Sequence, residues 1–332
     1  MWPVLHTCAG YLRRSTDQVP TGVSVATSAR AAGNDRAVWS GKRCVAVLGV
    51  AAVLVGGCVH NVDEPAGLPT ATVTVSRIAT LAALLPDEVA ARGRLVIGVN
   101  LPQPPNQFRD SAGRIVGFDI DLITAVATIL GLRADYRQAD FEKIIPAVRA
   151  GGYDIGTASF TDTRERERVV DFVTYYATGT LWVQRAGSTL TPQSACGSTV
   201  AVQTATMADT HEVPAESAAC RRRGLPPIEK VKFDRQDVAT NALMLGRVAA
   251  MSADQPVSLW AIEQSGGRLV AAGEPSTPTP YGWPVAKDSG LAEPIRQALQ
   301  HLIDTGDYRR IAAAWNLTSG MVSAAVINGA LN

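Results

Sequence analysis

An arginine-rich segment that follows a run of hydroxyl residues is the first feature that could do chemistry. The segment "SFTDTRERERVVDF" covers residues 159–172, and Arg164 follows directly after Thr163. A guanidinium is a planar donor that matches a carboxylate with two parallel hydrogen bonds. Thr163 suits a helix N-cap, and the backbone N–H groups of the residues that follow it would be free to donate to an anion. The segment therefore predicts that Arg164 binds a carboxylate, whereas Arg166 and Arg168 are expected to pair with glutamates in solvent. The alternative is that all three are surface charges.

Alternating strand and helix patterns must position this segment. The expected strands are 95–99, 154–159, 179–184, 198–203, 229–233, 249–254 and 281–286, and the expected helices are 117–132, 141–151, 237–248, 290–304 and 307–316. The helix 117–132 places Phe118, Leu122, Val126 and Ile129 at helical spacing. Such alternation predicts doubly wound, parallel sheets. Because it runs once before residue 180 and once after it, we expect two α/β lobes whose ligand lies at the carboxyl ends of the strands.

The composition describes a globular chain. Of 332 residues, 46% are hydrophobic and 18% are charged, and the net charge is +1. Residues 1–57 hold six basic and two acidic residues, which leaves 25 basic and 28 acidic residues from Cys58 onward, a charge of about −3. No basic field is present that would attract nucleic acid.

The N-terminal region is expected to be an export signal rather than part of the fold. In "GKRCVAVLGVAAVLVGGC", residues 41–58, Lys42 and Arg43 precede an apolar run of 12 residues. A span of the bilayer takes roughly 20 apolar residues, so this run fits a secretory signal instead. The closing "VGGC" resembles a bacterial lipobox. We therefore expect that Cys58 is lipidated and anchors an extracytoplasmic protein to the outer face of the cell membrane. The alternative is a short buried element with a chance cysteine.

Export also changes how the cysteines are interpreted. Cys8, Cys44 and Cys58 belong to the presequence or the anchor, so Cys196 and Cys220 remain in an oxidising compartment. We predict that they form a disulfide, and the alternative is two unpaired thiols. The four histidines are scattered and none lies near a cysteine pair, so no metal site and no cofactor is expected.

Five separated motifs resemble one protein family. They are "LVIGV…PPNQFRDSAGRIVGFDIDLITAVA", "FEKIIPAVRAGGYDIGTASFTDTRERERVVDF", "VAVQTAT", "MSADQP" and "DTGDYRRIAAAW", within about residues 90–316. Their order and spacing resemble the extracellular solute-binding proteins of ABC importers, polar amino-acid subgroup. The cysteine spacing is similar to that of glutamine- or glutamate-binding lipoproteins from high-GC Gram-positive bacteria. The resemblance implies a type II, periplasmic-binding-protein-like clamp of two doubly wound lobes joined by two hinge strands.

The resemblance also implies a division of the chain. The expected parts are an N-terminal extension with the signal peptide (1–57), a tether (58–88), lobe 1 (89–178 and 284–317), lobe 2 (179–283) and a C-terminal tail (318–332). A short helix is expected near the end of the tether.

Family members bind both poles of an amino acid. By resemblance, Arg164 holds the ligand carboxylate and Asp254 pairs with the α-ammonium. A helix cap before residues 255–264 is the alternative role for Asp254, and the two roles can coexist. The strand end around Gly156 and Thr157 would offer a backbone carbonyl to the ammonium, and Ser159 would offer a hydroxyl.

The remaining site positions concern the far lobe and the ligand side chain. By resemblance, Thr206 meets the carboxylate from lobe 2, although Ala205 stands where relatives have glycine. Phe141 is expected to lie over the ligand side chain. Gln103 either contacts the ligand or belongs only to the loop. By the same resemblance, relatives for cationic ligands often carry an acid at the position of Asn100. The amide there predicts an uncharged ligand such as glutamine or asparagine, or one similar to glutamate, rather than lysine or arginine.

The function implied is a receptor that captures a polar amino acid and delivers it to the membrane subunits of an ABC permease. The alternative is a sensor that binds the same amino acid and signals through a membrane partner. An enzyme is not expected, because the sequence shows no nucleophile–base pair and no metal set. The protein is expected to be a monomer.

Overall fold

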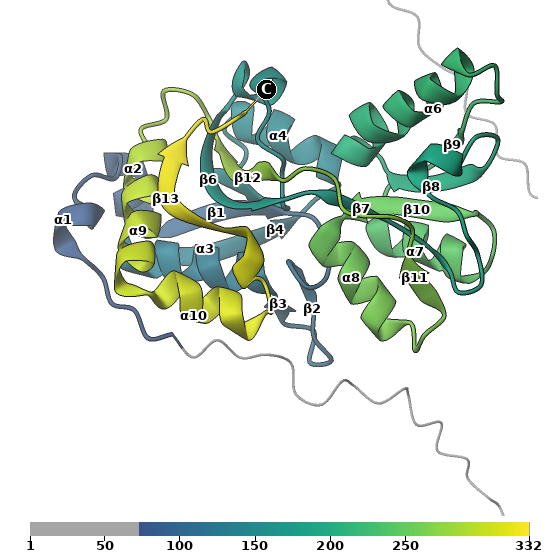
Figure 1. Cartoon of the computed structure of the whole chain (residues 1–332). Helices are drawn as coiled ribbons and strands as arrows, with labels where there is room; N and C mark the ends of the chain where they lie inside the picture. Colours follow the sequence, from purple (N-terminus) through teal and green to yellow (C-terminus); the bar gives the residue numbers. More distant parts are fainter. Residues whose placement is uncertain (1–72, 332) are drawn as a thin grey trace, which may run out of the picture. The chain divides into compact units, whose positions relative to one another are not determined.

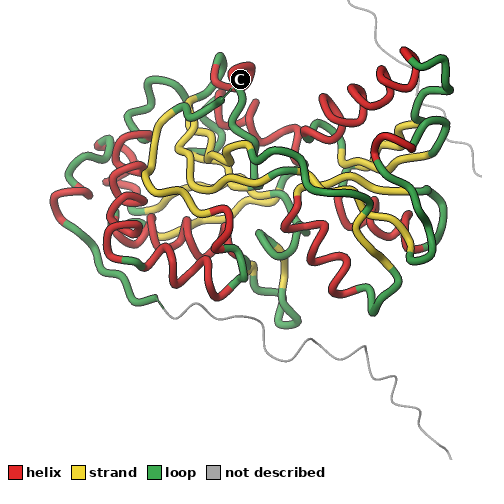
Figure 2. Tube along the Cα trace, viewed as in Figure 1, coloured by secondary structure: helices red, strands yellow, loops and turns green. Residues whose placement is uncertain are grey.

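The computed structural model describes residues 73–331, which form two α/β lobes (Figure 1). The predicted signal peptide, the predicted lipidation site at Cys58 and the first part of the tether lie outside the described residues. Figure 2 shows helices packed around the strands of each lobe. None of the described helices is long and apolar enough to cross a membrane.

A mixed six-stranded sheet forms the centre of lobe 1, in the order β13-β6-β12-β5-β1-β4. Its strands are β1 (Arg94–Val99), β4 (Arg133–Gln138), β5 (Ile155–Thr157), β6 (Asp171–Thr178), β12 (Thr279–Val285) and β13 (Met321–Ile327). β1 pairs in parallel with β4 and β5, as βαβ connections require. β12 and β13 run antiparallel to β6, so the sheet is not parallel throughout. The strands β2 (Phe108–Arg109) and β3 (Ile115–Val116) form a separate hairpin.

The helices of lobe 1, apart from the charged α5, bury their apolar residues against this sheet and against one another. They are α1 (Ala79–Ala82), α2 (Asp87–Arg92), α3 (Phe118–Ile129), α4 (Phe141–Arg149), α5 (Arg164–Glu167), α9 (Ala292–Thr305) and α10 (Asp307–Ala314). The four apolar residues of α3 that have helical spacing in the sequence are all buried in one core cluster, which confirms that prediction. Burial of each such side chain contributes about 1.5–3 kcal/mol.

Lobe 2 is built on a five-stranded sheet in the order β11-β7-β10-β8-β9. Its strands are β7 (Thr180–Arg185), β8 (Thr199–Gln203), β9 (Glu229–Phe233), β10 (Ala250–Asp254) and β11 (Leu269–Ala271). Its helices are the 3₁₀ turn η1 (Pro192–Ser194), the π-helical turn η2 (Ala208–Glu212), α6 (Val213–Arg222), α7 (Gln236–Met244) and α8 (Gln255–Gln264). β8 pairs in parallel with β9 and with β10, so their carboxyl ends meet at one edge of the sheet.

Two chain segments connect the lobes, one between β6 and β7 and one between β11 and β12. They touch each other, because Thr180 N donates to Ser276 Oγ at 2.8 Å and Ser276 N donates to Thr180 O at 2.9 Å. A Cβ on Gly179 would lie 2.1 Å from Ser276 O, so only glycine permits this approach. β12 starts at Thr279 within the lobe 1 sheet, and the stretch 279–283 therefore belongs to lobe 1 rather than lobe 2.

The C-terminal residues are part of lobe 1. The expected tail contains the 3₁₀ turn η3 (Thr318–Gly320) and β13, which occupies the edge of the six-stranded sheet beside β6 (Figure 1, yellow). Ala325 on β13 is buried. The sequence of this segment has no helical or alternating pattern strong enough to predict the strand, which forms because β6 offers an unpaired edge.

The predicted disulfide is confirmed. Cys196 and Cys220 are bonded, and they join the loop before β8 to α6. Reduction, or a Cys196→Ala/Cys220→Ala double variant, is expected to lower the free energy of unfolding by roughly 3 kcal/mol because the unfolded chain gains loop entropy. Thermal unfolding with and without reductant measures this. The order of ligand preference is expected to stay unchanged, and a changed order would mean that the loop shapes the binding site.

Candidate functional site

The carboxyl ends of four parallel strands define the cleft between the lobes. Asn100 follows β1 and Ala158 follows β5 in lobe 1, while Gln203 ends β8 and Asp254 ends β10 in lobe 2. Loops leave the sheet at these ends, where side chains from both lobes can meet one ligand. The lobes already touch here, since Gln203 Nε2 donates to Asn100 Oδ1 at 3.0 Å.

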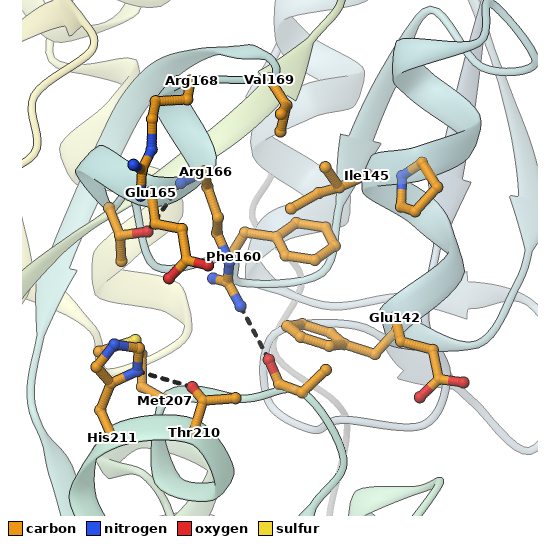
Figure 3. Close-up of a pocket in the computed structure, with 14 residues that line it drawn as sticks. Glu142, Ile145, Phe160, Glu165, Arg166, Arg168, Val169, Met207, Thr210 and His211 are labelled. Carbon is orange, nitrogen blue, oxygen red and sulfur yellow. Dashed lines mark hydrogen bonds between the residues drawn. The ribbon is translucent and has the colours of Figure 1, made fainter.

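Arg166, not Arg164, extends into the cleft. Figure 3 shows the Arg166 side chain in the cavity. Its guanidinium donates to Thr161 O at 2.8 Å and across the cleft to Ala205 O at 2.9 Å. Burial lowers the pKa of Arg166 to about 10, so the side chain stays charged at neutral pH. Arg164 is exposed. The expectation that Arg166 faces solvent is therefore wrong, and the geometry does not favour Arg164 as the carboxylate ligand.

Helical geometry explains why these arginines differ. α5 is a single turn whose N-cap, Thr163, accepts from Arg166 N at 3.2 Å, as its position predicts. At 100° per residue, Arg164 and Arg168 project to nearly the same side, and Arg166 projects to the opposite side. The spacing of the three arginines thus places Arg166 on the side of the helix opposite to Arg164 and Arg168. This difference could have been predicted from the sequence. A helix of four residues also has too few aligned peptides to hold an anion by its dipole.

Two aromatic rings support the Arg166 side chain. Its guanidinium carbon lies 5.7 Å from the ring centroids of both Phe141 and Phe160, within the range of cation–π contacts. The two rings stack with centroids 4.5 Å apart. These residues, with Ala205 and Met207 from lobe 2, line a cavity of about 730 Å³ at the cleft (Figure 3). Phe141 therefore lies in the cleft, and Phe160, which was not among the predicted site residues, lies beside it.

Asp254 carries the opposite charge in lobe 2. Its side chain makes no cap hydrogen bond to α8, so capping does not use its oxygen atoms. The pKa of Asp254 is raised to about 6; burial is the main cause, Glu212 acts in the same direction, and Arg166 opposes the rise. The carboxylate and the Arg166 guanidinium are close enough for each to affect the other's pKa. The two charges needed for a zwitterion thus lie near each other and come from different lobes.

Ser159 lies at the centre of a buried polar network. Its φ is +54°, a left-handed conformation that non-glycine residues adopt at a cost and mostly at functional sites. Ser159 Oγ donates to Asp119 Oδ2 at 3.0 Å and accepts from Asn106 Nδ2 at 2.8 Å. Burial raises the pKa of Asp119 to about 7. Neither Asn106 nor Asp119 was predicted, because each stands in a segment that is explained by helix or loop formation.

The predicted amide residues are buried and already bonded. Asn100 Nδ2 donates to Ala139 O at 3.0 Å while its oxygen accepts from Gln203, so both ends of this amide are engaged. Gln103 Oε1 accepts from Gln107 Nε2 at 2.7 Å, which makes Gln103 part of the loop structure.

At the carboxyl end of β5, Gly156 and Thr157 have different roles. A Cβ on Gly156 would lie 2.7 Å from Ile144 Cγ2 and 2.9 Å from Pro284 Cγ, so Gly156 permits close packing in lobe 1. Thr157 is fully buried, and its hydroxyl has no hydrogen-bond partner among the described residues. One side-chain oxygen on each of Asn106, Asp119 and Gln203 is also buried and has no hydrogen-bond partner among the described residues. Such unsatisfied buried groups mark a place where a polar ligand gains hydrogen bonds.

The turn after β8 uses an unusual residue. Thr206 Oγ1 donates to Gln203 O at 2.7 Å, which fixes the turn, and the Ala205 carbonyl accepts from Arg166. Ala205 has a φ of +64°, so the backbone adopts a left-handed conformation that favours glycine. The turn is therefore formed at some cost in strain.

This strain is measurable. Ala205→Val is expected to lower the free energy of unfolding by about 1–3 kcal/mol, because a β-branched residue is poorly tolerated at positive φ. Ala205→Gly is expected to stay within about 1 kcal/mol of the parent, because strain relief and chain entropy oppose each other. Urea denaturation compares the three proteins. Equal stability of the Val and Gly variants would contradict the left-handed turn.

The cleft holds charged and polar groups suited to binding and no assembled catalytic set. No cluster of three or more His, Cys, Asp or Glu residues that could hold a metal ion occurs within residues 73–331. Arg166, Asp254 and the Ser159 network can satisfy a carboxylate, an ammonium and neutral polar groups, respectively.

Comparisons with known proteins agree with this arrangement. The arginine-binding protein ArgT of Corynebacterium glutamicum is 39% identical over 292 residues, which cover 86% of this chain and 96% of the relative. The ABC transporter glutamine-binding protein GlnH of Bacillus subtilis is 29% identical and covers 62% of this chain and 74% of the relative. The solved structure described as an ancestral arginine-binding protein bound to glutamine is 34% identical, with a TM-score of 0.63 over 68% of this chain and 99% of that chain.

The family assignment covers most of the described chain. Residues 95–318 match the family described as bacterial extracellular solute-binding proteins, family 3. Its members are binding proteins rather than enzymes, in agreement with the predicted fold and function. The chain therefore belongs to the bacterial extracellular solute-binding proteins, family 3, and is a substrate-binding receptor for polar amino acids.

Proposed function

We propose that the cleft binds L-arginine and that the loaded protein delivers it to an ABC permease. The observation that carries this proposal is that Arg166 lines the cavity from lobe 1 while Asp254, at the end of β10 in lobe 2, is near enough for the two charges to affect each other's pKa. In this proposal the guanidinium of Arg166 holds the α-carboxylate, and Asp254 holds the α-ammonium. A ligand held at both poles would keep the lobes together, which is the form that a permease can recognise.

The charges around the cleft favour a cationic side chain. Burial is the main cause that raises the pKa of Asp119, and the charge of Asp254 adds a smaller rise. Glu212 adds a third carboxyl group beside Asp254. Of the two arginines that line the cavity, Arg166 is the one that lowers the pKa of Asp254, and Arg168 is exposed. An amino acid with a net charge of +1 compensates this excess better than a neutral one does.

Glutamine remains the competing ligand. The prediction of an uncharged ligand rests on the amide of Asn100, at a position where the family resemblance implies that relatives for cationic ligands often have an acid. That amide is bonded to Ala139 O and Gln203, so it has little capacity left to select a ligand side chain. The relatives support both ligands, since ArgT is named for arginine and the ancestral protein holds glutamine.

A thermal-shift screen with the twenty amino acids tests the proposal. Arginine is expected to raise the unfolding midpoint most, because a ligand that binds the folded state stabilises it. Calorimetry in two buffers of different ionisation enthalpy then counts protons. The pKa values of Asp119 (about 7) and Asp254 (about 6) predict that arginine binding at pH 6.5 releases protons as the carboxyls ionise. A midpoint that rises with glutamine and not with arginine would select the competing ligand.

We also propose that lipid on Cys58 anchors the protein outside the cytoplasm. The VGGC sequence and the preceding apolar run support this. Expression in an actinobacterial host followed by membrane fractionation tests it. The parent is expected in the membrane fraction with a lipidated N-terminal cysteine detected by mass spectrometry, and Cys58→Ala is expected to lose the lipid. An unmodified Cys58 in the mature protein would contradict this proposal without affecting the ligand site.

A further inference from the structure

The last residues of the chain contact the segment that carries Arg166. Beyond β13, Gly329 N donates to Asp162 Oδ2 at 2.8 Å, and Ala330 N donates to Glu167 Oε1 at 3.0 Å. Asp162 lies just before α5, and Glu167 is its last residue. The two acceptors therefore hold α5 at both ends, and both donors come from the C-terminus.

α5 has little support of its own. It contains four residues, and its main internal bonds are those from Arg166 N and Glu167 N to Thr163. A single helical turn is unstable in isolation, because nucleation fixes several residues for one hydrogen bond. The position of Arg166 must therefore be set by contacts from outside the helix.

The C-terminal residues are themselves held firmly. Asn328 Oδ1 accepts from Phe172 N at 2.9 Å, and Asn328 Nδ2 donates to Asp171 Oδ1 at 3.0 Å. These bonds attach the end of β13 to the start of β6. A Cβ on Gly329 would lie 2.6 Å from Thr174 Oγ1, so the chain passes close to β6 at this point. The segment reaches α5 from a strand that is part of the lobe 1 sheet.

We propose that residues 328–330, which we call the C-terminal strap, position Arg166 for the ligand carboxylate. Arg166 donates to Thr161 O and Ala205 O rather than to Glu167, so Glu167 acts on it through the backbone of α5. Loss of the strap would let α5 shift and would weaken both the ligand contact and the bond to lobe 2. This inference rests on the proposed function of Arg166 as the carboxylate ligand.

Two variants break the same bond from opposite sides. Glu167→Ala removes the acceptor, and Ala330→Pro removes the N–H donor at a residue that lies beyond β13 and outside the core clusters. Each is expected to raise the Kd for L-arginine, or for L-glutamine if the screen selects it, roughly tenfold, the scale of coupling within one network. Together they are expected to do no more than either alone. Glu167→Gln keeps the accepting oxygen and is expected to restore binding, and Leu331→Ala, at an exposed side chain, is the control.

A double-mutant cycle separates positioning from simple stabilisation. In an Arg166→Ala background, Glu167→Ala and Ala330→Pro are expected to leave the Kd unchanged while still lowering the melting temperature. If Glu167→Ala and Ala330→Pro lower the melting temperature of the parent but leave its Kd unchanged, the strap is only structural and the inference is overturned. If Arg166→Ala itself binds the amino acid normally, the proposed site fails and the inference fails with it.

Discussion

Arg166→Ala is expected to weaken amino-acid binding at least a hundredfold, which corresponds to roughly 2.8 kcal/mol. In the proposed complex the guanidinium gives a carboxylate two charge-assisted bonds inside a cleft from which water is excluded. Removing it leaves a desolvated anion without a partner, a loss that exceeds the value of one neutral hydrogen bond. The substitution also deletes the bond to Ala205 O, so the lobes lose one of their contacts. Isothermal calorimetry measures the change.

Arg164→Ala is the matched control for this prediction. It removes an arginine from the same helical turn, but from its exposed side. Its Kd is expected to stay within about twofold of the parent, because surface charges contribute little. Arg166→Lys keeps the charge and loses the planar fork, so an intermediate Kd is expected. A large loss with Arg164→Ala and none with Arg166→Ala would restore the assignment made from sequence.

Asp254→Asn is expected to have an effect of similar size. The substitution keeps the shape of the side chain and removes the charge that would compensate the α-ammonium. A buried ammonium without a counter-charge is strongly destabilised, so a loss of a hundredfold or more is expected. Calorimetry at pH 7.5 measures it. Ser258→Ala, at a buried residue one turn further along α8, tests whether any disturbance of that helix would do the same.

The pH dependence provides an independent check on Asp254. Its pKa of about 6 means that the ligand-free carboxyl becomes protonated as the pH falls through 6, so affinity for the ammonium is expected to decline there. The folding stability of the ligand-free protein is expected to depend on pH in the opposite direction. A raised pKa in the folded state stabilises the fold below the unfolded pKa of 3.8, and this stability is lost as the pH rises through 6. Glu212 raises the pKa of Asp254, and Arg166 lowers it. Binding by Asp254→Asn with an unchanged decline near pH 6 would assign the titration to another group.

Much of the framework could be predicted from periodicity and residue type. The apolar spacing of α3, the alternation of strands and helices, and the two extracytoplasmic cysteines each depend on local pattern or on simple pairing. β13 and the boundary of the hinge were harder to predict, because strand formation at a sheet edge depends on which neighbouring strand is available for pairing. Thr279–Val285 belongs to lobe 1 because it pairs with β5 and β6, which the chain order does not reveal.

The sequence by itself determined the class of the protein, the residue types of the site and the side of the fold on which they lie. It supplied three arginines on one helical turn, and only the tertiary structure decided that Arg166 enters the cleft. The physical reason is that a single turn has no fixed direction until its surroundings hold it. Here Phe141, Phe160 and Ala205 surround the guanidinium, and Asp162 and Glu167 bond to the C-terminal strap. These contacts join residues that are up to 167 positions apart, and a local sequence pattern carries no information about them.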